Sequence, residues 1–145
     1  EYIGRKTSVL SRRCCDDVKW HNPPELEKVY CFMTYCKWSG AMGIVGEMVK
    51  NYYGPRCELV KVSTCKKYGE RLGLKQPDKE WASVGILTIL HLLNEYDVLH
   101  LYGFSYEALN EHYFDLKPRD SQFHTAQKEH KMVKMLVKEG RCILI

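Results

Sequence analysis

The stretch SVGILTILHLLNEYDVLHLYGF, residues 83–104, contains two consecutive elements of a protein core. Ser83 can act as the N-cap of a helix running to about Tyr96, because its hydroxyl can accept from a first-turn N–H. This helix is apolar nearly all round, which predicts that it is buried. Residues 98–102 then have the composition of a core strand that ends at Gly103. A buried helix followed directly by a buried strand favours an α/β fold.

An α/β unit is also predicted upstream of this stretch. Residues 29–33 form a short apolar run typical of a buried strand, and residues 58–62 alternate like a half-exposed strand. Between them, apolar residues recur at helical spacing before a stop at Tyr53-Gly54-Pro55. These residues are Ala41, Met42, Ile44, Val45, Met48 and Val49. The order strand, helix, strand predicts a mostly parallel sheet with helices on both faces.

The C-terminal part of the chain predicts one more helix. It begins after Thr125, ends at Gly140 and carries an apolar stripe. The stripe consists of Met132, Val133, Leu136 and Val137. Residues 143–145 are expected to return as an edge strand or a packed tail. The breaks at residues 23–24 and 75–78 are too short for linkers, so residues 1–145 predict a single domain.

The composition is that of a globular domain, since 45% of the 145 residues are hydrophobic and 28% are charged. No apolar run approaches the ~18 residues of a membrane span. The first residues lack the apolar stretch of a signal peptide. A membrane anchor upstream of Glu1 stays an open expectation.

The net charge of +4 is unevenly distributed, because no Lys or Arg lies between Trp81 and Leu116 while basic residues crowd the end of the chain. A nucleic-acid-binding protein usually has a denser basic face with interleaved aromatic residues. The pattern therefore predicts no nucleic-acid partner. It favours a solvated helix face, with some cations available to an anionic small-molecule ligand.

The cysteines do not form a zinc-binding pattern. There are seven, and the odd number leaves at least one unpaired within this chain. No C-x-x-C pair occurs, and the spacings of Cys14-Cys15 and of Cys31 with Cys36 match no common zinc site. Disulfides stay open, because their connectivity cannot be read from sequence.

The candidate chemistry gathers around two histidines and one helix start. A helix that begins at Ser83 with Gly85 close behind presents backbone N–H groups, which prefer anions, although most serine-capped helices bind nothing. His112 lies in the polar stretch after a predicted strand, and His124 lies just before the last predicted helix. In such loops histidine can serve as a base or a cation. The alternative is that each is a surface or capping histidine.

The remaining titratable residues have simpler interpretations. His91 and His100 are expected to be packed structural residues, and His21 and His130 solvated ones. Glu129 falls in the first turn of the helix that His124 introduces, where the helix dipole favours a carboxylate, so it is expected to organise rather than to carry a proton. No Asp-x-Asp element is present, which favours metal-free chemistry.

Three ordered segments resemble motifs of the eukaryotic-type sialyltransferases. They are Ala82-Ser83-Val84-Gly85-Ile86-Leu87 through His100-Leu101-Tyr102-Gly103-Phe104, then His112-Tyr113-Phe114-Asp115, then His124 with Glu129, and they resemble the short, third and very short motifs. Ile3-Gly4-Arg5-Lys6-Thr7-Ser8 is similar to the segment after the family's long motif. The resemblance implies that residues 1–145 are the C-terminal portion of a catalytic domain with a single Rossmann-like, GT-A-like fold.

The resemblance also implies an activity, namely inverting, metal-independent transfer of sialic acid from CMP-sialic acid to a glycan hydroxyl, without a cofactor. The acceptor would be a glycoprotein or glycolipid. The sequence from residues 103–106 to the single helix after His124 looks more like the α2,3-transferring branch, which uses terminal galactose, than the α2,8 or α2,6 branches. The family works in the Golgi lumen behind an upstream membrane anchor. The implied site has His124 as general base, His112 at the CMP phosphate, Ser83, Val84, Gly85 and Tyr113 at the donor, and Glu129 and Gly103 in support.

The chain also departs from the family pattern. Val84 replaces a hydroxyl residue, Tyr96 stands where a disulfide-forming cysteine is usual, and the long motif is not among these residues. These departures leave open a catalytically inactive sialyltransferase-like protein that binds CMP or glycan. A third hypothesis, a nucleic-acid module, rests only on the basic C-terminal helix and is disfavoured by the charge distribution.

Overall fold

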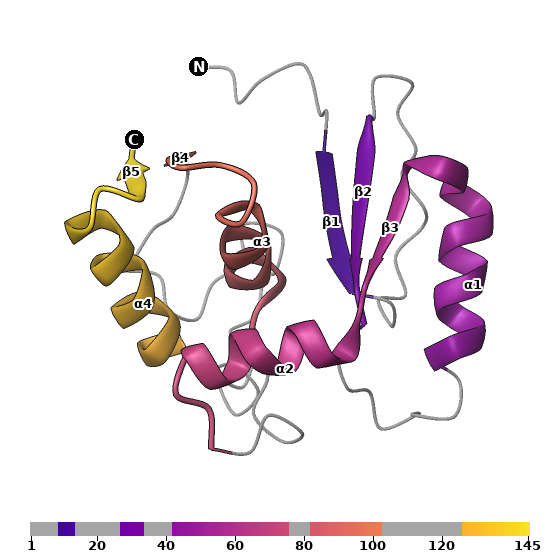
Figure 1. Cartoon of the computed structure of the whole chain (residues 1–145), viewed down its shortest axis with the longest axis horizontal. Helices are drawn as coiled ribbons and strands as arrows, with labels where there is room; N and C mark the ends of the chain where they lie inside the picture. Colours follow the sequence, from indigo (N-terminus) through magenta and orange to yellow (C-terminus); the bar gives the residue numbers. More distant parts are fainter. Residues whose placement is uncertain (1–8, 14–26, 34–41, 76–81, 103–125) are drawn as a thin grey trace, which may run out of the picture. The chain divides into compact units, whose positions relative to one another are not determined.

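The structure is a computed structural model that describes residues 9–13, 27–33, 42–75, 82–102 and 126–145 (Figure 1). The chain divides into two compact units, Glu1–Lys67 and Tyr68–Ile145, and each is considered by itself. Every pair of neighbouring strands in the described residues is parallel. Parallel strands combined with helices confirm the predicted α/β class, whereas the Rossmann-like, GT-A-like arrangement stays a prediction.

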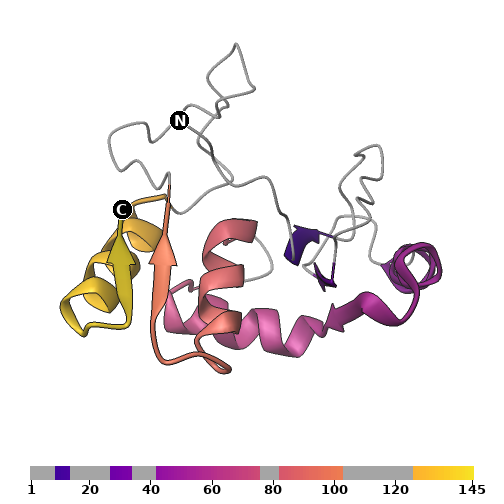
Figure 2. The ribbon, with the colours of Figure 1, turned by 90° about the horizontal axis from the view of Figure 1, so that it is seen from above.

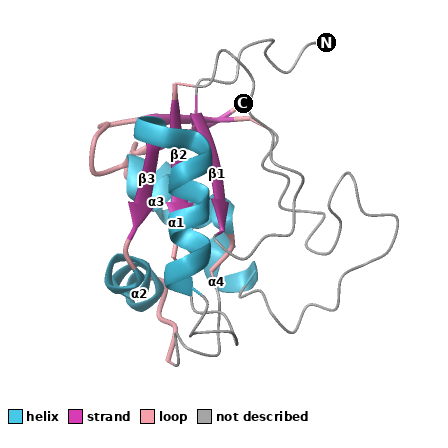
Figure 3. Ribbon diagram, turned by 90° about the vertical axis from the view of Figure 1, so that its right-hand side faces the viewer, coloured by secondary structure: helices cyan, strands magenta, loops and turns pink. Residues whose placement is uncertain are grey.

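The first unit contains a three-stranded sheet and a helix that covers it (Figure 3). Its strands are β1 (Val9–Arg13), β2 (Lys28–Phe32) and β3 (Cys57–Val60), in the order β1-β2-β3. Helix α1 (Met42–Tyr53), followed by the short 3-10 helix η1 (Gly54–Arg56), connects β2 to β3. The predicted order strand, helix, strand is thus confirmed, and it forms a βαβ unit.

The core of this unit lies between β2 and α1. Val29 and Cys31 of β2 pack against Val49 and Tyr53 of α1, and all four side chains are buried. Met48 was expected on this apolar face, but it is 56% exposed. Because an α-helix turns once every ~3.6 residues, the side that carries Val49 and Tyr53 leaves Met48 pointing away from the sheet.

Helix α2 (Val62–Arg71) follows β3 and was not predicted. The strand expected over residues 58–62 ends at Val60, and Val62 already begins the helix. The helix ends in a Schellman motif, in which Gly73 has φ +72° and the Gly73 and Leu74 N–H groups donate to the Glu70 and Gly69 carbonyls at 2.8 and 3.0 Å. Strand β1 was likewise not predicted.

The second unit contains α3 (Val84–Leu92), β4 (Leu99–Leu101), α4 (Ala126–Lys138) and β5 (Cys142–Leu144). Figure 2 shows β4 and β5 side by side with α4 next to β5, and the two strands pair in parallel. Helix α4 ends at Gly140, which has φ +73°, and the Arg141 N–H donates to the Leu136 carbonyl at 2.8 Å. Both the predicted end of this helix and the returning edge strand are confirmed.

Helix α3 is buried as expected, with Ile86 and Leu90 at most 2% exposed, but it ends at Leu92 rather than near Tyr96. The Asn94 amide donates to the carbonyls of Leu90 and His91 at 3.3 and 3.0 Å. An Asn side chain that binds the carbonyls of the last turn in this way competes with continued helix.

Several predicted burials in this unit are wrong. His100 is exposed, because successive side chains of a strand alternate and the buried one is Leu101. Val137 is 36% exposed, beside the buried stripe residues of α4. His130 is half-buried rather than solvated, whereas His91 is half-buried and packed as expected. Within the described ranges, no helix is long and apolar enough to cross a bilayer.

Candidate functional site

The structure describes four of the predicted site residues: Ser83, Val84, Gly85 and Glu129. The other four lie outside the described residues, and they are Gly103, His112, Tyr113 and His124. The geometry of the site is therefore built from the start of α3 and the first turn of α4.

Ser83 is the N-cap of α3, as predicted. Its backbone is extended, with φ −65° and ψ 156°, and its Oγ accepts a hydrogen bond from the Ile86 N–H at 3.3 Å. Its carbonyl accepts from the Leu87 N–H at 3.1 Å. A serine in this conformation satisfies one of the otherwise unpaired N–H groups at a helix start.

Glu129 binds this N-cap with both oxygens of its carboxylate. Oε1 accepts from the Ser83 N–H at 2.7 Å, and Oε2 accepts from the Ser83 hydroxyl at 2.6 Å. Both distances are in the range of hydrogen bonds to an ionised group. Glu129 lies in the first turn of α4, where the helix dipole also favours a carboxylate. The structure thus brings the starts of α3 and α4 together through one side chain.

Two backbone donors are left at the start of α3. The Ile86 and Leu87 N–H groups are bound by Ser83, and no described residue accepts from the N–H groups of Val84 and Gly85. Gly85 is exposed and Val84 is half-buried. A helix start with available N–H groups and the positive end of the helix dipole attracts anions, which is the chemistry that the sequence predicted here.

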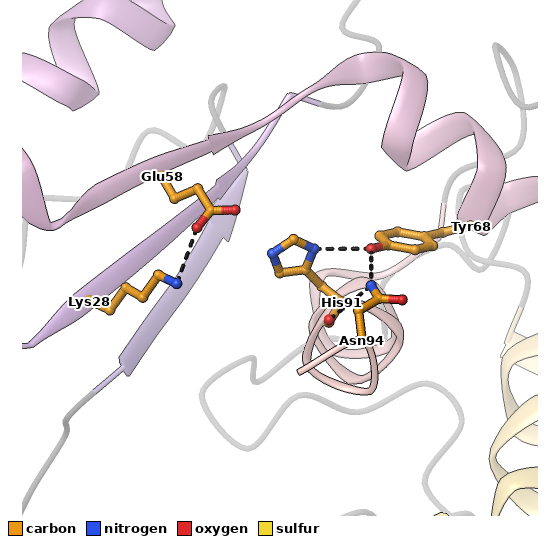
Figure 4. Close-up of polar contacts among 5 residues, drawn as sticks. All are labelled: Lys28, Glu58, Tyr68, His91 and Asn94. Carbon is orange, nitrogen blue, oxygen red and sulfur yellow. Dashed lines mark hydrogen bonds and ion pairs between the residues drawn. The ribbon is translucent and has the colours of Figure 1, made fainter. Parts of the chain in front are cut away.

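A second polar cluster lies at the other end of α3 and was not predicted (Figure 4). The Tyr68 hydroxyl is 3.0 Å from His91 Nδ1, and the Asn94 amide donates to the Tyr68 oxygen at 2.8 Å. The Asn94 amide is the donor to the Tyr68 oxygen, whereas the donor between Tyr68 and His91 Nδ1 depends on the tautomer of His91. No sequence signal pointed to this cluster, since Tyr68 lies on the unpredicted helix α2.

In the first unit, Lys28 connects β2 to β3. Its ammonium is 3.1 Å from the Glu58 carboxylate (Figure 4). The same ammonium is 4.5 Å from the centre of the Tyr30 ring. The side-chain hydrogen bond to Tyr30, followed by the interaction with Glu58, raises the pKa of Lys28 despite partial desolvation. This group is half-exposed and joins adjacent strands, which is the pattern of a structural contact rather than of a reactive amine.

Four cysteines lie in the part of the chain that the structure describes, and none of them forms a disulfide: Cys31, Cys57, Cys65 and Cys142. Cys142 on β5 is 1% exposed, and burial raises the pKa of its thiol while neighbouring Arg141 opposes the shift. A protonated, buried thiol behaves as a small apolar side chain. Each of these cysteines therefore contributes to the packing within its own unit.

Together these features define an α/β protein with parallel strands and a capped helix start suited to an anion. Comparison with known families gives the more specific assignment. A sequence model of glycosyltransferase family 29 (sialyltransferase) matches residues 56–141, more than half of the chain. The chain belongs to this family, which confirms the resemblance. No curated protein and no solved structure matches the chain.

The family match includes the residues that form the Ser83–Glu129 contact. It also includes the stretches containing His112 and His124, whereas residues 3–8 precede it. Membership supports a sialyltransferase that uses a nucleotide-sugar donor and a glycan acceptor at the level of the family. The α2,3 branch and the individual motif assignments stay predictions.

Proposed function

We propose that the complete protein transfers sialic acid from CMP-sialic acid to a glycan hydroxyl, with inversion and without a metal ion. The observation that carries the proposal is the family match over residues 56–141. The Ser83–Glu129 contact supports it, because it joins the first and the last of the three segments that resemble sialyltransferase motifs.

The start of α3 is the proposed donor-binding segment. CMP-sialic acid carries a phosphate and a carboxylate, and the N–H groups of Val84 and Gly85 are suited to an anionic oxygen. Val84 contributes no hydroxyl. In this proposal the backbone therefore supplies the polar contacts at this end of the helix.

The two histidines are proposed to move the proton and to stabilise the leaving group. His124 takes the proton from the acceptor hydroxyl as the new glycosidic bond forms. The bond between sialic acid and the phosphate oxygen breaks, and cationic His112 neutralises the charge on the departing CMP. Tyr113 forms a wall of the nucleotide site, and Gly103 supports it.

The acceptor is proposed to be a glycoprotein or glycolipid that ends in galactose. The proposed location is the Golgi lumen, with a membrane anchor upstream of Glu1. The Lys residues on the exposed side of α4 are interpreted as a solvated face, so nucleic acid is not a proposed partner. DNA or RNA affinity that falls steeply with salt would contradict this interpretation.

The central test measures CMP release by the full-length protein with CMP-sialic acid and a galactose-terminated acceptor. His124→Ala is expected to reduce turnover by about 10²–10⁴-fold, the usual contribution of a general base. His100→Ala is the matched control, because His100 is an exposed histidine on β4 of the same unit. Equal turnover by the two variants, with unchanged melting temperatures, would refute the role of His124.

A second candidate function is a sialyltransferase-like protein that binds CMP without transferring sugar. It is favoured by Val84 in place of a hydroxyl residue and by Tyr96 in place of the usual cysteine, with a Tyr96 side chain that is 55% exposed. Calorimetric CMP binding by the full-length protein, without turnover of any galactose-terminated acceptor, would favour this second candidate.

A further inference from the structure

Donors and acceptors can be assigned to the hydrogen bonds at Ser83 in only one way. A serine hydroxyl has one proton to donate and two lone pairs that accept. The Ile86 N–H donates to Oγ at 3.3 Å and occupies one lone pair. An ionised carboxylate only accepts, so the contact of 2.6 Å with Glu129 Oε2 uses the hydroxyl proton. The Ser83 hydroxyl therefore has no proton left for another acceptor.

The backbone of Ser83 is held in the same way. Its N–H donates to Glu129 Oε1 at 2.7 Å, so one carboxylate fixes both the main chain and the side chain of the N-cap. Glu129 lies in the first turn of α4, and the contact is half-buried. The Val84 and Gly85 N–H groups directly follow this N-cap, so a residue that fixes Ser83 is placed to fix their orientation as well.

We infer that Glu129 is a positioning residue that acts on donor binding through Ser83. In this inference the Ser83 hydroxyl makes no contact as a donor to the anionic substrate, and the polar contacts come from the N–H groups of Val84 and Gly85. It rests on the proposed function and goes beyond it, because it separates the residue that holds the helix start from the groups that touch the ligand. Both Glu129 oxygens accept from Ser83, which is the pattern of a carboxylate that holds the helix start.

The first test is a double-mutant cycle in the full-length protein with Glu129→Gln, Ser83→Ala and the double variant. Gln preserves the shape of Glu but places an NH₂ group opposite one of the two Ser83 donors. Each single variant is expected to raise KM for CMP-sialic acid about tenfold, the effect of losing a hydrogen bond to a charged group. The double variant should be no worse than either single one, and KM for the acceptor should not change.

Two variants serve as controls for this cycle. Ser83→Thr keeps the hydroxyl and should restore nearly normal donor KM. Glu139→Gln changes an exposed glutamate just beyond the other end of α4 and should have no effect. If instead the increases from Ser83→Ala and Glu129→Gln multiply in the double variant, Ser83 contacts the donor independently and the inference is overturned.

The second test asks whether the backbone makes the contact. Val84 is the first residue of α3, a position where proline is tolerated, and the extended backbone of Ser83 is compatible with a following proline. Val84→Pro thus removes one N–H with little change to the helix. It should raise donor KM about tenfold relative to Val84→Ala, by the same reasoning. Equal donor KM for the two variants would overturn the assignment of this N–H.

Failure of the proposed function can be distinguished from failure of this inference. If the wild-type protein neither turns over nor binds CMP-sialic acid, the proposed function fails. The melting temperatures of the four members of the cycle then still report the contact, because residues in one hydrogen-bond network have non-additive effects on stability. Additive melting temperatures would show that Glu129 does not act through Ser83.

Discussion

Arg141 provides the sharpest test of how the second unit is held together. Its Nε donates to the Asp97 carbonyl at 2.7 Å, and its Nη2 donates to the Leu93 carbonyl at 2.9 Å. These carbonyls belong to the turn between α3 and β4, whereas Arg141 lies between α4 and β5. The guanidinium thus connects the end of the buried helix to the last strand, so replacing it should loosen the whole unit.

The expected loss can be worked out from the two bonds. A hydrogen bond from a charged group contributes about 1.5–3 kcal/mol when buried, and less at the surface. The bond to Leu93 is half-buried and the bond to Asp97 is exposed, so we expect Arg141→Ala to cost about 2 kcal/mol. For a chain of this size, that loss lowers the melting temperature by about 4–8 °C.

The assay is thermal unfolding followed by circular dichroism. Lys138→Ala is the matched control, since Lys138 is an exposed cation at the end of α4, close to Arg141 in the sequence, and should change stability by less than about 0.5 kcal/mol. Arg141→Lys should recover only part of the loss, because an ammonium lacks the planar fork that reaches two carbonyls. The reasoning is refuted if Arg141→Ala melts within about 1 °C of the Lys138→Ala control.

Two further predictions concern buried polar groups of the same unit. Tyr68→Phe removes the hydroxyl that joins His91 and Asn94 and should lower the free energy of unfolding in urea by about 1–3 kcal/mol. Tyr96→Phe is the control, because the Tyr96 ring is exposed and its change should have no such effect. Equal urea midpoints for the two variants would contradict the role of the Tyr68 cluster. The raised pKa of Cys142 means that the folded state favours the protonated thiol. The stability that this thiol contributes is therefore fully present below its ordinary pKa of 9.0 and is lost as the pH rises above that value. Cys142→Ala should reduce the fall of the melting temperature at alkaline pH. If the pH dependence of the melting temperature is unchanged in this variant, other groups cause the fall.

The elements that were predicted correctly are those with strong periodicity or a clear end signal. The apolar repeat and the stop at Gly54 located α1, and the stripe that ends at Gly140 located α4. A short run that is apolar on both faces located β2. In each of these cases the local pattern and the tertiary environment favour the same structure.

The missed helix α2 shows the opposite situation. Val62, Ser63 and Thr64 have low helix propensity and extend the alternation of β3, so the sequence continued to resemble a strand. The available signal was at the other end, where Gly73 follows the last turn and Leu74 returns to the core at 6% exposed. This is the sequence pattern of a Schellman motif.

The sequence predicts the local role of each residue of the candidate site, but not the contact between the residues. A capping serine and a glutamate in a first helical turn are both local signals, and the sequence predicts each of them. The hydrogen bonds between Ser83 and Glu129 span 46 residues, and no spacing rule pairs them. The Tyr68 cluster depends on tertiary packing in the same way. His100 and Met48 were expected to be packed but are exposed, because only one face of their strand or helix is covered.

The parallel pairing of β4 with β5 has a consequence for biosynthesis. Leu99 lies opposite Cys142, so at about 5–20 residues per second the first strand leaves the ribosome roughly 2–9 s before its partner. During that interval β4 lacks the strand that pairs with it and presents backbone hydrogen-bonding groups to other chains. Substitutions that slow or weaken the docking of β5 should therefore reduce the yield of soluble protein more than the stability of the finished fold would suggest.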